Sequence, residues 1–315
     1  ASGLAVREGM DRMARIVATL GWSTQFYQEE RWRSVVGMSS LDDFINGVMK
    51  AYFEPMDPNV LLCEMHKWQR ADVSRHTAGD LARALAEALH AKGNKVIIAG
   101  RREAVLDAVT AANPGMESMR LDIQDGGDIA AFALRAVERF PQLDAILNNA
   151  GIMQPENVPA ADNLAIAEET IATNLLGPIR LTTALLPYLL KQPRATILTV
   201  SSGLAFVPLA ATPTYSATKA AIHSWSMGLR EQLRNTSVGV IEIAPPYVQT
   251  ELLGPHQAVD PAAMPLADFI SEVMTILETQ PEAGEVIVGR CKPLRFAEAT
   301  GTFGQVFAAL NAQHA

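Results

Sequence analysis

The 315-residue chain has little cysteine, few aromatic side chains and no surplus of positive charge. Its two cysteines, Cys63 and Cys291, lie far apart, so neither a disulfide framework nor a cysteine-based zinc site is indicated, and we predict no metal. The 26 basic residues are outnumbered by 34 acidic ones, and no basic stripe offsets the net charge of −8. These features argue against nucleic acid and anionic membranes as partners.

Long apolar runs are missing as well. No stretch has the length that a membrane span needs, and Arg7, Glu8, Asp11 and Arg12 make the N-terminus unlike a signal peptide. Apolar residues make up 49% of the chain and charged residues 19%, which is typical of a globular protein. We therefore expect a cytoplasmic protein whose partner is a small molecule or another protein.

The chain changes character near residue 80. Residues 1–80 contain three of the four tryptophans and show the apolar spacing of helices, so we predict a helical segment there. Within it, the apolar run 59–63 has two interpretations, as part of a helix that starts at Pro58 or as a short buried strand. Residues 81–315 are predicted to form a second domain.

Helical and strand-like segments alternate from residue 81 onwards. Helices are predicted at 81–89, 102–112, 127–139, 164–190 and 213–234. Strands are predicted at 96–99, in a run that ends at Leu121, and at 145–147, 195–200, 238–243 and 285–288. The strand-like segments are continuous apolar runs, as in parallel strands that helices cover on both faces. The pattern predicts an α/β fold with a doubly wound, Rossmann-like parallel sheet.

Tyr215 and Lys219 stand one turn apart in the predicted helix 213–234 and share one of its faces. An ammonium near a phenol lowers the tyrosine pKa from about 10 towards neutrality, which favours proton exchange with a carbonyl or alcohol oxygen. Ser202, just after a predicted strand, is a candidate to hydrogen-bond the same oxygen. The Tyr-x-x-x-Lys spacing alone also occurs as a surface pair.

The surroundings of this pair make the signal more specific. Asn-Asn-Ala-Gly at 148–151 follows a buried strand, where a crevice opens in such sheets, and Asn174 lies on the next predicted helix. Four apolar residues follow Ser202 and belong either to the wall of a substrate pocket or to the core: Leu204, Phe206, Val207 and Leu209.

With Tyr-Ser-Ala-Thr-Lys at 215–219 and Pro-Pro-Tyr-Val-Gln-Thr at 245–250, residues 84–315 resemble the short-chain dehydrogenase/reductase family. The resemblance implies that Tyr215 is the general acid/base and that Lys219 lowers its pKa and holds the nicotinamide ribose. Ser202 would orient the carbonyl of a small carbonyl or alcohol substrate, and Asn174 would anchor a proton-relay water.

The resemblance also implies a nicotinamide cofactor. Arg101 and Arg102 follow the strand 96–99 with no acidic residue to bond a ribose 2′-hydroxyl, so NADP is favoured over NAD. A solvated turn is the alternative interpretation of this arginine pair. The other implied contacts are Asp122 at the adenine, Asn149 and Gly151 along the channel, and Val248 and Thr250 at the carboxamide and phosphates.

The first strand of that family and its Gly-rich turn, Thr-Gly-x-x-x-Gly-x-Gly, are missing. The turn should fall at residues 75–82, which keep one glycine and place Asp80 where backbone amides hold the cofactor pyrophosphate. Without the first strand, the flanking strands would face each other across a gap. The run 59–63 is a candidate for that slot, although it would need a loop longer than about a dozen residues.

Residues 1–83 have a resemblance of their own, to the helical cap of homoserine O-acetyltransferase-like α/β-hydrolases. It rests on Gly21, Trp22, Ser23, Phe26, Tyr27, Glu30, Trp32, the stretch 40–44, Asp57, Pro58, Asn59, Trp68, Gln69 and Asp72. The segment has no Gly-x-Ser-x-Gly nucleophile elbow, and Ser23, His66 and His76 are not interpreted as a catalytic set. The chain has the pattern of a chimera between a hydrolase cap and a reductase.

The leading functional hypothesis is an NADP-dependent oxidoreductase that moves a hydride between nicotinamide and a carbonyl or alcohol substrate while Tyr215 handles the proton. The alternative is a catalytically silent or binding-only protein that cannot hold the dinucleotide because the Gly-rich turn is absent. The resemblance also implies a homo-oligomer paired through the helices 164–190 and 213–234.

Overall fold

The computed structural model describes residues 80–159 and 164–312. The chain divides into two units, Ala1–Ala71 and Asp72–Ala315, and the described residues belong to the second. The run 59–63 and the residues Ser23, His66 and His76 lie outside the described residues, as does nearly all of the predicted helical segment. The predicted domain boundary near residue 80 stays a prediction.

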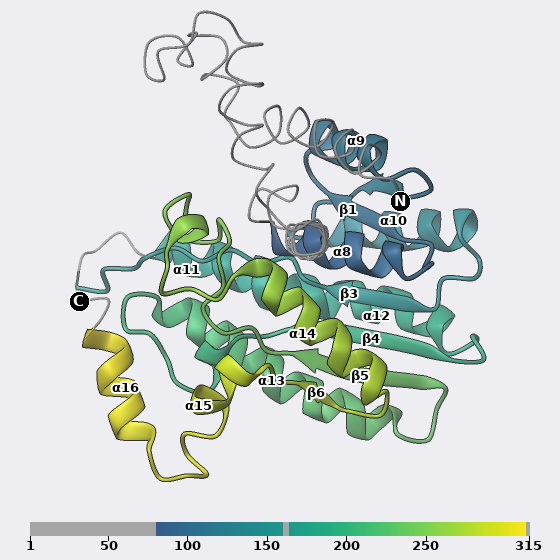
Figure 1. Cartoon of the computed structure of the whole chain (residues 1–315). Helices are drawn as coiled ribbons and strands as arrows, with labels where there is room; N and C mark the ends of the chain where they lie inside the picture. The colour runs from purple at the N-terminus through teal and green to yellow at the C-terminus, as the bar shows by residue number, and fades with distance from the viewer. Residues whose placement is uncertain (1–79, 160–163, 313–315) are drawn as a thin grey trace, which may run out of the picture. The chain divides into compact units, whose positions relative to one another are not determined.

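Helices and strands alternate along the described chain, as the sequence predicts (Figure 1). The strands are β1 (Ile97–Gly100), β2 (Glu117–Arg120), β3 (Ala145–Asn148), β4 (Ala195–Val200), β5 (Val238–Ile243) and β6 (Glu285–Val286). The helices are α8 (Leu81–Ala91), α9 (Glu103–Ala112), α10 (Gly126–Arg139), α11 (Leu164–Ile171), α12 (Gly177–Leu189), α13 (Pro213–Leu233), α14 (Leu266–Thr279), α15 (Lys292–Arg295) and α16 (Phe303–Ala312). The sequence pattern did not predict α14, α15 or α16.

The predicted helix 164–190 is not one regular helix. Its first part, α11, passes through a π-helical turn, η2 (Ala172–Leu176), into α12. Such π-turns often occur at functional sites, because the extra residue changes the direction of a side chain. Asn174 lies inside this turn.

The described strands form two separate parallel sheets. β1 pairs with β2, and the other sheet has the order β3-β4-β5-β6. No ladder joins β1 to β3 within residues 80–159 and 164–312. This break lies where the sequence lacks the first strand of a Rossmann-like sheet, so the described residues form that fold without its usual first βα unit.

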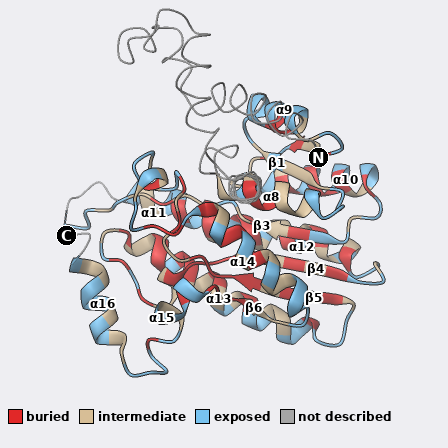
Figure 2. Ribbon diagram, in the orientation of Figure 1, coloured by how far each residue is buried: buried red, intermediate tan, exposed pale blue. Residues whose placement is uncertain are grey.

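Burial differs between the two sheets (Figure 2). In β4, Ile197 is fully buried. In β1, no residue is buried: three are half-buried and Ala99 is exposed. Helices nevertheless cover both faces of the run 96–99, as predicted: Ile98 packs against the cluster with Ala86 and Val109, and Ile97 packs against the cluster with Ile129 and Phe132. β1 is only half-buried, and one of its edges has no partner strand among the described residues.

The larger sheet has helices on both faces, as expected for a doubly wound fold. On one face, α8 and α14 pack over the sheet through a cluster that includes Leu85, Phe269 and Ile243. On the other face, α12 and α13 pack through Leu185, Leu233 and Val240. Helices therefore cover both faces of this sheet.

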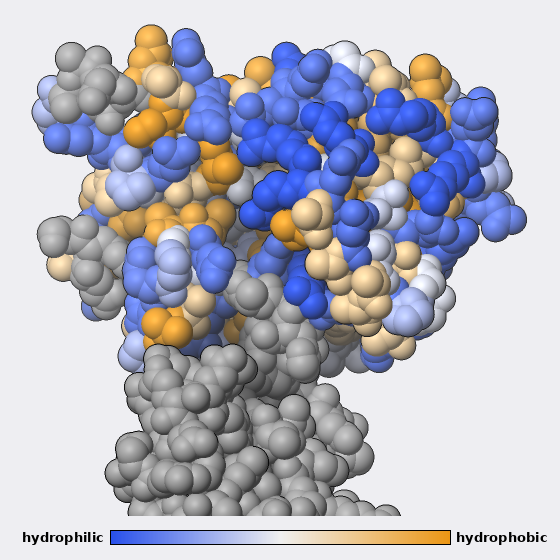
Figure 3. Space-filling model, turned by 90° about the horizontal axis from the view of Figure 1, so that it is seen from above, coloured by the Kyte–Doolittle hydropathy of each residue, from blue (hydrophilic) through white to orange (hydrophobic). Residues whose placement is uncertain are grey.

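The face seen in Figure 3 carries many hydrophilic side chains, with groups of apolar side chains exposed among them. None of the described helices combines the length and the apolar character needed to cross a membrane.

Candidate active site

Tyr215 and Lys219 lie on the first turns of α13, which begins at Pro213. Proline suits this position because the first helical amide has no partner within the helix. Both side chains are buried, with 5% and 4% of their surface exposed. The Lys219 Nζ lies 5.5 Å from the Tyr215 ring centroid and donates a hydrogen bond of 2.8 Å to the Val200 carbonyl at the end of β4. The predicted pair is therefore in the interior and not on the surface.

Ser202 follows β4 and caps the short 3-10 turn η3 (Gly203–Ala205). Its Oγ accepts a hydrogen bond of 3.1 Å from the Leu204 amide. Its hydroxyl also hydrogen-bonds the Tyr215 side chain. The two hydroxyls predicted to face one carbonyl oxygen are thus neighbours in the structure.

Asn174 connects three parts of the site. Its Oδ1 accepts from the Ile152 amide at 2.8 Å, and its Nδ2 donates to the Ile152 carbonyl at 2.9 Å and to Thr218 Oγ1 at 3.3 Å. A Cβ at Gly151 would lie 3.5 Å from Asn174 Oδ1 and 3.6 Å from Lys219 Nζ. The turn 148–151, the π-turn and α13 therefore meet within contact distance, as their order along the chain suggested.

The pKa values differ from the expectation for this pair. Burial raises the pKa of Tyr215 to about 12, although the hydrogen bond with Ser202 opposes that rise. Burial lowers the pKa of Lys219 to about 8, and the charge of Glu242 opposes that fall. The expected lowering of the tyrosine pKa towards neutrality is not found, because desolvation of a buried phenolate outweighs the favourable terms. At neutral pH the tyrosine hydroxyl keeps its proton.

The apolar residues after Ser202 divide between the two predicted roles. Leu204 and Leu209 pack in the cluster around Tyr215, together with Met153 and with Leu310 of α16. Phe206 instead contacts His223 edge to face and lies under Arg295, and Val207 is fully buried. Of the four residues, Leu204 and Leu209 are therefore the ones in the cluster with Tyr215.

The residues implied for the nicotinamide and adenine ends are accessible or have unused polar atoms. Arg101 and Arg102 follow β1, are exposed and form no ion pair with any described residue. The Oδ1 of Asn149 is buried without a hydrogen-bond partner in the described part of the chain. Asp122 lies just after β2, where its Oδ1 accepts from the Gln124 amide at 3.0 Å.

Two further implied cofactor contacts lie in the loop after β5. Val248 and Thr250 are both buried, and the Gln257 Nε2 donates to the Val248 carbonyl at 2.8 Å and to Thr250 Oγ1 at 3.0 Å. Gln257 thus holds this loop through two hydrogen bonds, a role that the sequence did not indicate.

The residues at the start of α8 do not fit the pyrophosphate of such a cofactor. Asp80 caps α8, and its carboxylate accepts a hydrogen bond of 3.1 Å from the Arg83 amide. A helix N-terminus attracts phosphate through free amides and a positive dipole end. Here a carboxylate of the chain already uses one of those amides and adds a negative charge. The described residues therefore fit the nicotinamide half of the dinucleotide and not its pyrophosphate.

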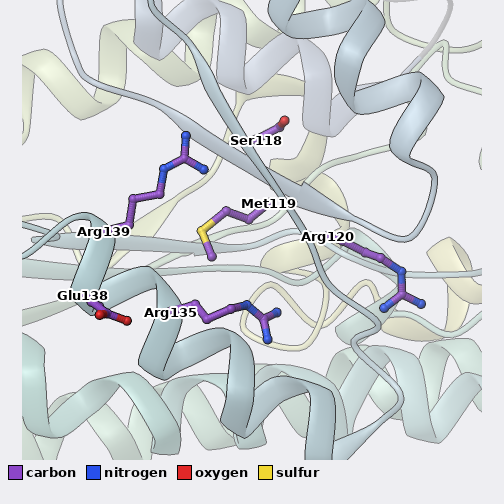
Figure 4. Close-up of a pocket in the computed structure, with 6 residues that line it drawn as sticks. All are labelled: Ser118, Met119, Arg120, Arg135, Glu138 and Arg139. Atoms are coloured by element: carbon purple, nitrogen blue, oxygen red, sulfur yellow. The ribbon is translucent and has the colours of Figure 1, made fainter.

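A shallow pocket elsewhere on the molecule is not part of this site (Figure 4). It is lined by Ser118, Met119, Arg120, Arg135, Glu138 and Arg139, from β2 and α10. Its arginines are paired with acidic residues, since Arg120 and Arg135 contact Asp128 and Arg139 contacts Glu117. None of its lining residues is among the predicted site residues.

Sequence reasoning missed a charged group behind the site. His223, one turn after Lys219 on α13, hydrogen-bonds Glu242 of β5 at 2.8 Å. A signal was present, because Glu242 is an acidic residue inside the apolar run 238–243.

A relationship to known proteins covers most of the described part. The model of the family described as short chain dehydrogenase matches residues 77–259. The oxidoreductase DltE of Bacillus subtilis is 43% identical over 169 residues, which cover 53% of this chain and 67% of that protein. The structure of a short chain dehydrogenase from Burkholderia cenocepacia in complex with NADP matches with a TM-score of 0.63 and 27% identity, over 74% of this chain and 94% of that one.

A second relationship is of another kind. The ethyl acetate hydrolase of Pseudomonas veronii is 50% identical over 84 residues, which cover 27% of this chain but only 24% of that protein. This partial match supports the resemblance to α/β-hydrolases, and it spans too little of that enzyme to carry its activity. From the family model, the relatives and the arrangement of Tyr215, Lys219 and Asn174, we conclude that the chain belongs to the short-chain dehydrogenase family of oxidoreductases.

Proposed function

We propose that the protein is an NADP-dependent oxidoreductase that acts on a small carbonyl compound or alcohol, with Tyr215 as the group that exchanges the proton. The observation that carries the proposal is the contact between three separate segments. Asn174 and Lys219 both lie within about 4 Å of the position of a Cβ at Gly151, which is ordinary van der Waals distance. Family membership supplies the reaction class.

The state of Tyr215 favours carbonyl reduction. With a pKa of about 12, the hydroxyl is protonated at neutral pH and can donate its proton to a carbonyl oxygen. Ser202, which hydrogen-bonds Tyr215, is placed to hold the same oxygen, and the Lys219 ammonium stabilises the negative charge that remains on the phenol. A bound nicotinamide would supply the hydride.

Two observations support NADP as the cofactor. Arg101 and Arg102 are exposed and unpaired among the described residues, and a pair of guanidiniums suits a 2′-phosphate. A related short chain dehydrogenase was solved in complex with NADP. We extend that cofactor to this chain as part of the proposal, and we place Asp122, Asn149, Gly151, Val248 and Thr250 along it.

A second candidate function is favoured by one specific observation. The Asp80 carboxylate occupies the N-terminus of α8, where the family binds pyrophosphate through a Gly-rich turn. A chain that cannot hold the dinucleotide would be catalytically silent, or would bind ligands without turning them over.

Titration of the full chain with NADPH, followed by cofactor fluorescence, separates the two candidates. Saturation at about micromolar concentration supports the oxidoreductase, and no binding at about 1 mM favours the silent protein. The same titration of a chain that carries a Gly-rich strand and turn ahead of Ala84 tests the cause. If the grafted chain binds no better than a non-binding wild type, the Gly-rich turn is not the missing element.

A further inference from the structure

A row of polar side chains crosses the larger sheet at one register level. The row consists of Asn148 on β3, Thr199 on β4, Glu242 on β5 and Glu285 on β6, which are partners in consecutive strand pairs. Each has a side-chain partner on the covering helices, namely Thr182, Ser226, His223 and Arg295 respectively. The level lies one residue before Val200, whose carbonyl accepts from Lys219.

Glu242 is the unusual member of this row. Its side chain is fully buried, its Oε2 bonds His223 Nδ1 at 2.8 Å, and its Oε1 has no hydrogen-bond partner among the described residues. A buried carboxylate with one unpaired oxygen is costly for folding unless a cation compensates its charge. Such a residue calls for a reason beyond packing.

The groups around Glu242 show which cations could compensate its charge. From β6 and α15, Glu285 and Arg295 face it, but Arg295 holds both carboxylate oxygens of Glu285, at 2.8 and 3.0 Å. Those two charges offset each other. One ligand atom from each of His223, Glu242 and Glu285 lies within 4.8 Å of the others, so these three side chains form a cluster.

Three further groups face the cluster. Arg230 of α13 donates to the carbonyls of Val240 and Gly284, at 3.0 and 2.5 Å, and is thereby fixed to the backbone. Burial raises the pKa of Cys291 to about 12, so this thiol is neutral. The third group is Lys219, which lies one helical turn before His223 on α13 and is bonded to Val200 of β4, the strand next to Glu242. The charge of Glu242 also opposes the fall in the Lys219 pKa that burial causes.

We propose that Glu242, held in place by His223, is a positioning residue that places its carboxylate behind the Lys219 ammonium, on the strand next to the Val200 carbonyl that binds this ammonium. The proposal rests on the proposed function for its catalytic meaning. Its physical content can be tested separately, because a coupling between Glu242 and Lys219 needs neither cofactor nor substrate. Glu242 lies behind the site and touches no reacting atom.

A stability measurement tests the coupling without activity. Lys219 has a pKa of about 8 in the folded chain against an ordinary 10.5, so the unfolded chain binds more protons between these values and stability rises with pH there. The free energy of unfolding is measured for wild type, Glu242→Gln, Lys219→Met and the double variant, at pH 7 and again near pH 10. We expect a favourable coupling energy at pH 7, where Lys219 is charged, that is lost near pH 10.

The matched control is the same cycle with Glu285→Gln in place of Glu242→Gln. Glu285 is also acidic and in the same row, but its charge is offset by Arg295, so we expect no pH-dependent coupling to Lys219. If Glu242 is merely structural, Glu242→Gln weakens the fold equally at both pH values with no coupling to Lys219→Met. That result overturns the proposal.

The activity test uses the pH profile of carbonyl reduction. Removing the Glu242 charge lowers the Lys219 pKa further, so the alkaline limb of kcat/KM should move to lower pH by about one unit. Glu242→Asp, which keeps the charge, should restore the limb, and Glu285→Gln should leave it in place. If the alkaline limb of the pH profile stays in place in all variants, the proposal is contradicted. If the wild type has no activity at all, the proposed function is contradicted, and the coupling energy from the unfolding measurements then tests the role of Glu242.

Discussion

The two sheets of the molecule differ in how completely they are built. The β3–β6 sheet has four paired strands, helices on both faces and the contacts that join Tyr215, Lys219 and Asn174. Among the described residues, the β1–β2 sheet has two strands, its first strand is half-buried, and the Asp80 carboxylate caps the start of α8. Under the proposed function, the larger sheet carries the proton-transfer residues and the smaller one lies at an altered cofactor end.

Under the proposed function, the two halves of the dinucleotide site depend on different parts of the fold. Proton-transfer geometry depends on α13, the π-turn and the ends of β3 and β4, and each of these is fixed by contacts within the larger sheet. Phosphate binding depends on a single turn before α8. Loss of that turn therefore leaves the chemical residues in position.

The largest expected effect is on kcat and comes from a substitution beside the β3–β6 sheet. Tyr215→Phe removes the proton donor and should lower kcat for carbonyl reduction by about 100-fold to 10,000-fold while NADPH affinity stays nearly unchanged. Steady-state kinetics and the fluorescence titration measure the two quantities. The control, Tyr188→Phe on α12, removes a hydroxyl far from the site and should leave kcat within about twofold. Equal activity of wild type and Tyr215→Phe would refute the assigned role.

Most of the larger sheet could be predicted from the sequence, because continuous apolar runs and helical spacing are local signals. The strands at 195–200 and 238–243 appear with the predicted bounds, and α13 starts at the predicted Pro213. The shared face of Tyr215 and Lys219 follows from a spacing of four residues. These features need no knowledge of the rest of the chain.

Other features depend on neighbours that local patterns do not contain. The π-turn that contains Asn174 lies where α11 and the turn itself pack against α13, and the sequence shows only a long helix. The Tyr215 pKa depends on total burial, and the row through Glu242 depends on strand register. The half-burial of β1 was not predicted, because a run of apolar residues does not reveal which neighbouring strands it pairs with.

A matched pair of core substitutions compares the two sheets directly. Ile197→Ala in β4 removes a fully buried side chain and should lower the free energy of unfolding by about 2–5 kcal/mol. Ile98→Ala in β1 removes a half-buried side chain, and the loss should be nearer about 1 kcal/mol. Urea denaturation measures both values. Equal losses would mean that β1 is as well packed as β4, and the contrast between the sheets would fail.

The smallest expected effect concerns the one cofactor feature that the β1–β2 sheet keeps. Arg101 and Arg102 are exposed at the end of β1, where solvent screens their charges, so their joint contribution to binding a 2′-phosphate is modest. Replacing both with Ala should reduce the preference for NADPH over NADH by about tenfold, with NADH affinity unchanged, because only NADPH carries that phosphate.

The double variant Arg135→Ala and Arg139→Ala is the matched control for that change. It removes two exposed positive charges from α10 and alters the net charge by the same amount, but its residues lie in the pocket beside β2. If both double variants lower NADPH affinity equally, general attraction of an anionic ligand explains the effect. If only the pair at 101 and 102 changes the ratio of the two affinities, then the recognition of the 2′-phosphate has survived in the same sheet that lost its Gly-rich turn.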